Sequence, residues 1–188
     1  MADKRTELQT LAQAIVQRSG LHELSFRQLA ERTGVKSSSV HYYFPEKHDL
    51  TAVLISSYSE AFAQRLAAID AQPGSLKRKL SGFVDLFEQA AQDDKLCLCG
   101  MLAAEISSLD ERCRGLLSGF FRQAELWLAR ILEQHQGEVL SPLPPGRLAA
   151  VLMSGLEGAL LLDRVHGAGA HLQAQRQLID SFATGSPS

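Results

Sequence analysis

The chain has 188 residues, 45% of them hydrophobic, and a formal net charge of −2. This is enough apolar material for one domain, or for a small domain attached to a larger one. No apolar run approaches the roughly 18 residues that would indicate a membrane span, and the nearly neutral charge does not by itself indicate a nucleic-acid partner.

The N-terminal sequence and the cysteines together argue against secretion. Residues 1–5 lack the apolar stretch of a secretory signal, so we expect a cytoplasmic protein without a membrane partner. Cys97, Cys99 and Cys113 form an odd set without regular spacing, which argues against a disulfide framework. Cys97-x-Cys99 has no nearby pair of histidines, so we expect no metal site and no cofactor.

Helical periodicity begins at the N-terminus. Apolar residues recur at steps of three and four through residues 8–16, and Gly20 is expected to end this helix. Ser25 and Gln28 have the spacing of a capping box, in which each side chain bonds the other residue's backbone N–H. The short helix that they open should stop at Gly34, and another short helix should follow at residues 36–43.

The rest of the chain continues the helical pattern. A connector rich in proline, residues 141–146, cannot be helical throughout, and Ser108-Leu109-Asp110-Glu111 is a second capping-box pattern. We find no alternating strand pattern. The sequence predicts an all-α fold of about nine helices, the later ones being at residues 50–69, 76–87, 94–105, 111–131, 148–165 and 171–182.

The N-terminal helices indicate a helix-turn-helix. Two short helices joined by a turn of about three residues, with a preceding helix to brace them, have the form of this DNA-binding motif. A recognition helix must present short side chains and hydrogen-bonding groups to base edges and phosphates. Val40 and Phe44 are expected to seat the helix, and the predicted DNA-binding residues are Ser25, Arg27, Lys36, Ser37, Ser38, Ser39, His41, Tyr42 and Lys47.

At these residues the sequence resembles the DNA-binding domain of the TetR family of transcriptional regulators. The family pattern runs Ala-x-x-x-Gly-Val-Ser-x-Gly-Thr-hydrophobic-Tyr-x-Tyr-Phe-x-x-Lys-x-x-Leu, and residues 30–50 follow it closely. Ser38 replaces a frequent glycine and His41 a frequent tyrosine. These two differences affect which operator sequence is expected and not which fold. The resemblance implies a DNA-binding domain at residues 1–47 and a ligand-binding and dimerisation domain at residues 48–188.

The resemblance also implies a homodimer that pairs its last two long helices. The predicted interface consists of Leu152, Gly155, Leu156, Ala159, Leu160, Leu178 and Phe182. In this interpretation the glycines allow close helix approach and the leucines supply the buried area. The alternative is that helix 148–165 is only the central core helix of a monomer.

The segment at residues 96–105 resembles one branch of the same family, in which Cys-x-x-Gly opens the sixth helix and some members respond to electrophiles. A thiol near a helix N-terminus is favoured as the reactive thiolate, so Cys97 could sense such a compound; the alternative is that the cysteines only pack. The candidate ligand-contact residues, whose spacing also fits plain core packing, are Phe83, Phe87, Cys97, Met101, Glu105, Phe120 and Trp127.

These patterns predict a ligand-responsive transcriptional regulator, most simply a repressor. A homodimer would bind a palindromic operator in double-stranded DNA and leave it when a small-molecule inducer binds. An activator has the same sequence signature. The alternative, from another functional class, is a helical small-molecule carrier or an enzyme. The sequence has no paired Ser, His and acid and no phosphate-binding glycine loop to support an enzyme.

Overall fold

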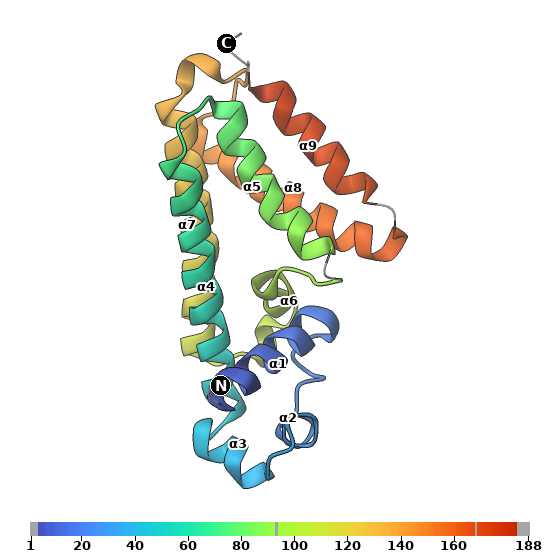
Figure 1. Ribbon diagram of the computed structural model, residues 1–188. Coiled ribbons are helices and arrows are strands. Elements are labelled where there is room, and N and C mark those ends of the chain that lie inside the picture. The colour runs from blue at the N-terminus through green and yellow to red at the C-terminus, as the bar shows by residue number, and fades with distance from the viewer. Residues whose placement is uncertain (1–3, 93, 168, 184–188) are drawn as a thin grey trace. The chain divides into compact units, whose positions relative to one another are not determined.

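The structure is a computed structural model that describes residues 4–92, 94–167 and 169–183 (Figure 1). Within these residues it contains nine α-helices and two short 3₁₀ helices, η1 (Ile106–Ser108) and η2 (Gln136–Glu138). The α-helices are α1 (Lys4–Ser19), α2 (Phe26–Thr33), α3 (Ser37–Tyr43), α4 (Lys47–Ala71), α5 (Leu76–Gln92), α6 (Leu98–Ala104), α7 (Glu111–Gln134), α8 (Pro145–His166) and α9 (Ala170–Phe182).

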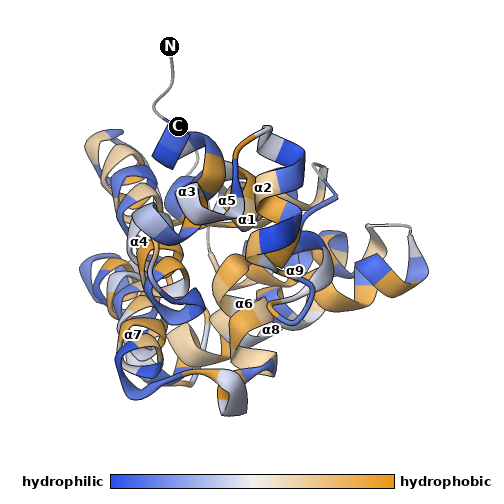
Figure 2. Cartoon of the chain, turned by 90° about the horizontal axis from the view of Figure 1, so that it is seen from below, coloured by the Kyte–Doolittle hydropathy of each residue, from blue (hydrophilic) through white to orange (hydrophobic). Residues whose placement is uncertain are grey.

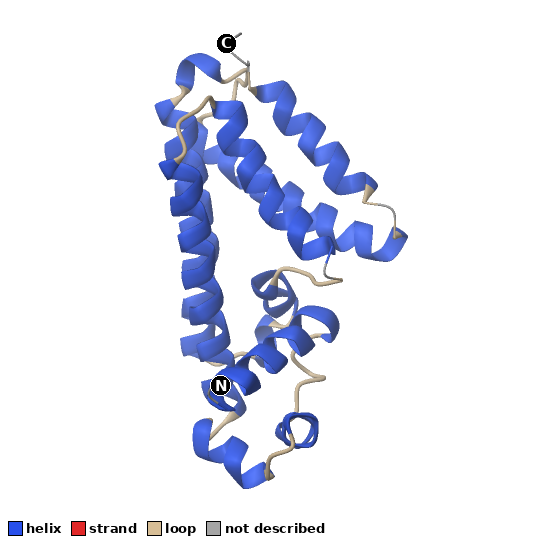
Figure 3. Ribbon diagram, viewed as in Figure 1, coloured by secondary structure: helices blue, strands red, loops and turns tan. Residues whose placement is uncertain are grey.

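The prediction of an all-α fold is confirmed. Blue and orange residues alternate along α4 and α7, the mixture expected of helices with one buried face (Figure 2). In the described part of the chain no strand is formed, and an isolated bridge joins Val139 to Ala183 (Figure 3). None of the described helices is long and apolar enough to cross a membrane.

The chain divides into two compact units. The first contains the chain up to Ala61 together with Leu98–Phe120, and the second contains Phe62–Cys97 and the chain from Phe121 onward. Two of the boundaries between the units, at residues 61–62 and 120–121, lie inside the continuous helices α4 and α7. The helix-turn-helix and the predicted dimerisation helices therefore belong to different units.

In the first unit, α1 braces the two short helices that follow it. Its buried residues Leu8, Ala12 and Val16 lie on one stripe, as their spacing predicts, and α1 contacts both α2 and α6. In the second unit, α5, α8 and α9 pack against one another in pairs. Arg176 of α9 strengthens this packing, because its guanidinium donates to Glu88 at 2.7 Å and to Ser81 at 2.8 Å on α5.

The helix starts show where local sequence patterns were insufficient. Ser25 accepts from the backbone N–H of Gln28 at 3.1 Å, but the reciprocal bond is missing, since Oε1 of Gln28 is buried and has no partner among the described residues. The second predicted capping box is wrong. Asp110, rather than Ser108, caps α7 by accepting from the N–H of Cys113 at 2.8 Å, because η1 occupies Ser108 and delays the helix start.

Candidate nucleic-acid interface

The turn between α2 and α3 is built on Gly34. This residue has φ 68° and ψ 27°, in the left-handed region that favours glycine, and its N–H bonds the carbonyl of Ala30. The N–H of Val35 bonds the same carbonyl at 3.1 Å, so the end of α2 is satisfied within the turn. This closure lets α3 begin after a turn of only three residues, 34–36, as a helix-turn-helix requires.

Two buried side chains seat α3. Val40 is 0% exposed and Phe44 is 1% exposed, as the sequence predicts for the inner face of this helix. The N–H of Phe44 bonds the carbonyl of Val40 at 2.9 Å, and Pro45 follows at the point where the helix stops. Burial of one face turns the rest of the helix outward.

The outer face of α3 carries short side chains at its start and an aromatic side chain at its end. Ser37 and Ser38 are exposed and Ser39 is half-buried. Tyr42 is 82% exposed, which is unusual for a large aromatic side chain. Lys36, at the N-cap, is exposed and makes no side-chain capping bond. Together they form an exposed face with hydroxyl groups and a cation, suited to contact base edges and phosphates.

Three other predicted DNA-binding residues already have partners in the chain. Ser25 caps α2, and Arg27 pairs with Glu31 at 2.8 Å across one helical turn. The ring of His41 packs edge-on against Phe26 with centroids 4.8 Å apart, so it helps to hold α2 against α3. Ser25 and His41 therefore have structural roles, and only the exposed Arg27 can exchange its partner for a phosphate at little cost.

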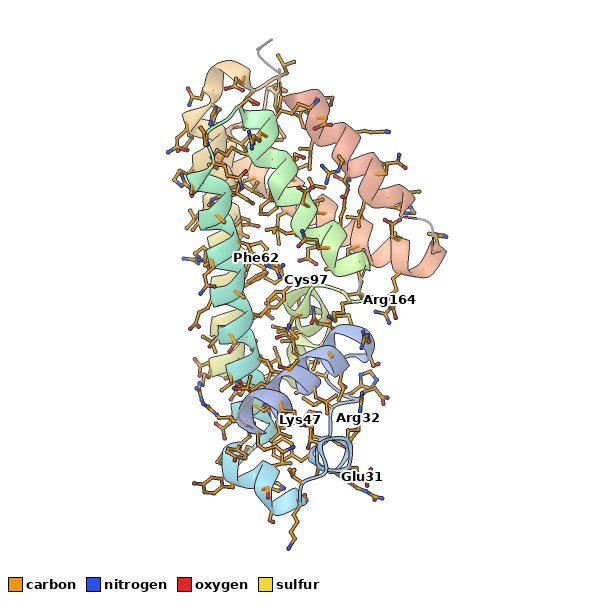
Figure 4. The ribbon with its side chains drawn as sticks, viewed as in Figure 1. Glu31, Arg32, Lys47, Phe62, Cys97 and Arg164 are labelled. Carbon is orange, nitrogen blue, oxygen red and sulfur yellow. The ribbon has the colours of Figure 1, made fainter. Side chains whose placement is uncertain are left out.

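Lys47 lies at the start of α4 (Figure 4). Together with Glu105 it lines a small cavity of about 140 Å³. The side chain is half-buried. Burial lowers the pKa of Lys47, and the nearby Glu105 carboxylate opposes that shift. In the free chain this lysine therefore has an anionic neighbour, which a DNA phosphate would have to replace.

Glu105, predicted as a ligand contact, instead holds the corner between α1 and α2. Its carboxylate accepts from the backbone N–H of Leu21 at 2.6 Å and of His22 at 3.1 Å. Gly20 allows this approach, because it has φ 93° and a Cβ there would lie 2.6 Å from the carboxylate. These bonds leave little capacity for a ligand.

Replacing Glu105 with alanine is expected to destabilise the first unit by about 1–3 kcal/mol, because the two N–H groups lose their acceptor. Glu105→Gln keeps an acceptor oxygen and should cost less. Urea unfolding of the two variants and the parent protein measures the difference, and equal stability of all three would contradict the assigned role.

Residues 10–54, which contain this motif, match the sequence pattern of the bacterial regulatory proteins of the tetR family. The helix-turn-helix is therefore similar to that of the tetR family. The HTH-type transcriptional regulator BetI of Yersinia pestis is 36% identical over 70 residues, a match that covers 35% of this chain and 35% of BetI. The chain thus aligns with about a third of the length of the curated relatives that it matches.

Two solved structures extend the likeness to the whole chain. A TetR transcriptional regulator from Legionella pneumophila has a TM-score of 0.91 and 29% identity, over 98% of this chain and 99% of the other. A TetR-family regulator from Agrobacterium tumefaciens has a TM-score of 0.92 and 25% identity, over 96% and 98% of the two chains. The chain therefore has the fold of these two TetR-family regulators over nearly all of its described residues.

The predicted ligand residues of this TetR-type fold do not all share one unit. Phe83, Phe87, Cys97 and Trp127 belong to the second unit, whereas Met101, Glu105 and Phe120 belong to the first. In the second unit, Phe83 lies near Phe87 at 5.6 Å and stacks on Trp127 at 5.5 Å. The indole N–H of Trp127 donates to Asp70 at 3.2 Å. These aromatic rings pack against one another, as side chains do in a hydrophobic core.

The structure also shows a buried carboxyl group that the sequence analysis missed. Glu157 of α8 shares a hydrogen bond with the buried Cys97 thiol, and its Oε1 has no hydrogen-bond partner among the described residues. Burial raises the pKa of Glu157 to about 7. A usable signal was present, because Glu157 is the only charged residue between Arg147 and Asp163. When ionised, Glu157 opposes a thiolate at Cys97.

The predicted dimer residues of α8 face mainly inward. Leu152, Leu156, Ala159 and Leu160 are at most 4% exposed in the single chain and have almost no surface to offer a partner. Gly155 admits the side chain of Gln175 from α9, since a Cβ at this glycine would lie 2.6 Å from that side chain. The exposed apolar residues of α8 are instead Val151, Leu161, Leu162 and Val165, whereas Leu178 of α9, which was predicted for the interface, is exposed.

Proposed function

We propose that the protein is a transcriptional regulator, and in its simplest form a repressor, that binds an operator in double-stranded DNA. The observation that carries the proposal is the outer face of α3, where Ser37, Ser38 and Tyr42 are exposed on a helix seated by buried neighbours in a TetR-type motif. Such a face can enter the major groove and contact base edges while Lys36 meets a phosphate.

The proposal includes a homodimer, for which exposed apolar residues provide the argument. Val151, Leu162 and Val165 are 49%, 47% and 78% exposed and recur at helical spacing along α8. Leu178 and the half-buried Phe182 on α9 extend the apolar surface. A two-fold interface on these residues would cover them and present two α3 helices to a palindromic site.

A small-molecule inducer completes the proposal, with residues 1–47 binding DNA and residues 48–188 binding the ligand and the second subunit. The second unit contains a cavity of about 390 Å³, lined mainly by the end of α5, by residues 94–96 that follow α5 and by the end of α8. Its wall is partly apolar, through Ala91, Leu96 and Leu160, and partly charged, through Lys95 and Arg164. An amphipathic ligand fits such a lining. Electrophile capture by Cys97 remains a narrower form of this proposal.

Selection from a randomised duplex pool, followed by binding measurements at two salt concentrations, tests the proposal. We expect one palindromic sequence class to be enriched. If Arg27, Lys36 and Lys47 of both subunits contact phosphates, affinity should fall about a thousandfold between roughly 50 and 200 mM salt. A pool without enrichment, or binding that is indifferent to salt, would contradict DNA recognition by this face.

A further inference from the structure

Three different metal-binding side chains meet in the first unit. His48, Asp110 and Cys113 each offer one donor atom, and these atoms all lie within 4.8 Å of one another. Nδ1 of His48 is 3.9 Å from Oδ2 of Asp110. The thiol of Cys113 lies 3.5 Å from the backbone carbonyl of His48. Imidazole, carboxylate and thiolate are the three protein ligand types that zinc accepts.

Two helix starts bring these residues together from positions far apart in the sequence. His48 lies in the first turn of α4, and Cys113 lies in the first turn of α7. Asp110 caps α7 with one oxygen, which accepts from the N–H of Cys113 at 2.8 Å. That bond orients the carboxylate and leaves its second oxygen directed at His48. The capping bond therefore acts as the support that a metal ligand needs.

We propose that His48, Asp110 and Cys113 bind a divalent transition metal of the zinc class. Zinc bonds of about 2.0–2.3 Å place tetrahedral ligand atoms roughly 3.5 Å apart, so the cluster must contract by about 1 Å. The side chains of His48 and Asp110 are 44% and 43% exposed and can make that movement, whereas Cys113 is buried and stays in place. The fourth position is open to water.

The charges around the cluster fit a cation. Asp110 and the neighbouring Asp49 are acidic, and Arg112 is paired with Asp49 at 3.5 Å. A cysteine binds zinc as its thiolate. Metal binding therefore replaces the thiol proton and releases it to solvent. The metal neutralises charge that the thiolate and carboxylate would otherwise place side by side.

Titration of the reduced full-length protein with Co²⁺ alone, in the absence of DNA, tests the site. We expect one equivalent to bind and to give a thiolate-to-cobalt charge-transfer band and the visible bands of tetrahedral cobalt. Zn²⁺ should then remove both sets of bands. Because the readout requires no operator, it succeeds or fails independently of the proposed DNA function.

Matched variants assign the ligands. Cys113→Ser should abolish the charge-transfer band, and His48→Gln and Asp110→Asn should each weaken binding at least tenfold. Asp110→Asn keeps an oxygen to cap α7, so its effect reports ligation rather than unfolding. Cys97→Ser, at a buried thiol of the second unit, should change nothing. The site is overturned if no band appears, if the band survives Cys113→Ser or is lost in Cys97→Ser, or if His48→Gln and Asp110→Asn leave the affinity unchanged.

Discussion

Replacing Glu157 with glutamine is expected to stabilise the protein at pH 8 much more than at pH 5. The carboxyl group is buried, one of its oxygens has no partner among the described residues, and its pKa is raised to about 7. Glutamine has nearly the same shape and cannot ionise. The variant therefore removes the cost of a buried charge and leaves the packing of α8 unchanged.

The direction of the pKa shift determines how the stability changes with pH. Glu157 has an ordinary pKa of 4.5 in the unfolded chain and a higher one in the folded chain. Its contribution to stability is complete below pH 4.5 and is lost as the pH rises through 7. The stability gained by Glu157→Gln should therefore grow by about 2–3 kcal/mol between pH 5 and pH 8.

Urea unfolding at several pH values measures this gain. Glu133→Gln is the matched control, because Glu133 is an exposed residue of α7, and it should show no comparable trend. A gain for Glu157→Gln that does not vary with pH would show that the carboxyl is not held neutral by burial.

Replacing Ser38 with glutamate is expected to lower operator affinity at least a hundredfold while the fold persists. Ser38 is exposed in the first turn of α3. An acidic residue in the first turn of a helix is favourable for the helix itself. On the side that is proposed to face DNA, however, the phosphates repel the same charge, and the longer side chain holds α3 away from the base edges. A hundredfold loss corresponds to about 2.7 kcal/mol.

Ser118→Glu is the control for this substitution. Ser118 is an exposed serine on α7, outside the helix-turn-helix, and its replacement should leave the affinity for the selected operator within about threefold. Circular dichroism of both variants checks that the helices form. If Ser38→Glu binds as tightly as the parent protein, α3 is not the helix that enters the groove.

The N-terminal motif was predictable because its signals are local. Gly34 adopts the left-handed turn that a helix end favours, Val40 and Phe44 are buried at their predicted spacing, and Ser25 caps α2. Each of these depends on residues within a few positions along the chain. The same is true of the all-α fold, since apolar residues at steps of three and four mark its long helices.

Side-chain roles inside the larger helices were not predictable in the same way. The leucines of α8 were assigned to a partner subunit, but Leu156 and Leu160 are buried within the single chain. Periodicity identifies an apolar face and carries no information about which surface covers it. The role of Glu105 was unpredictable for the same reason, because its partners, Leu21 and His22, lie more than 80 residues earlier in the sequence.

The sequence by itself determined the helices, their caps near the N-terminus and the helix-turn-helix, because backbone hydrogen bonds and apolar spacing act over one or two turns. Only the tertiary structure decided that the carboxyl group of Glu157 is buried beside Cys97 and that His48 meets Asp110 and Cys113. Those pairings join residues from separate helices. Their pKa values and their capacity to bind a ligand depend on burial and distance, which arise only when the helices pack.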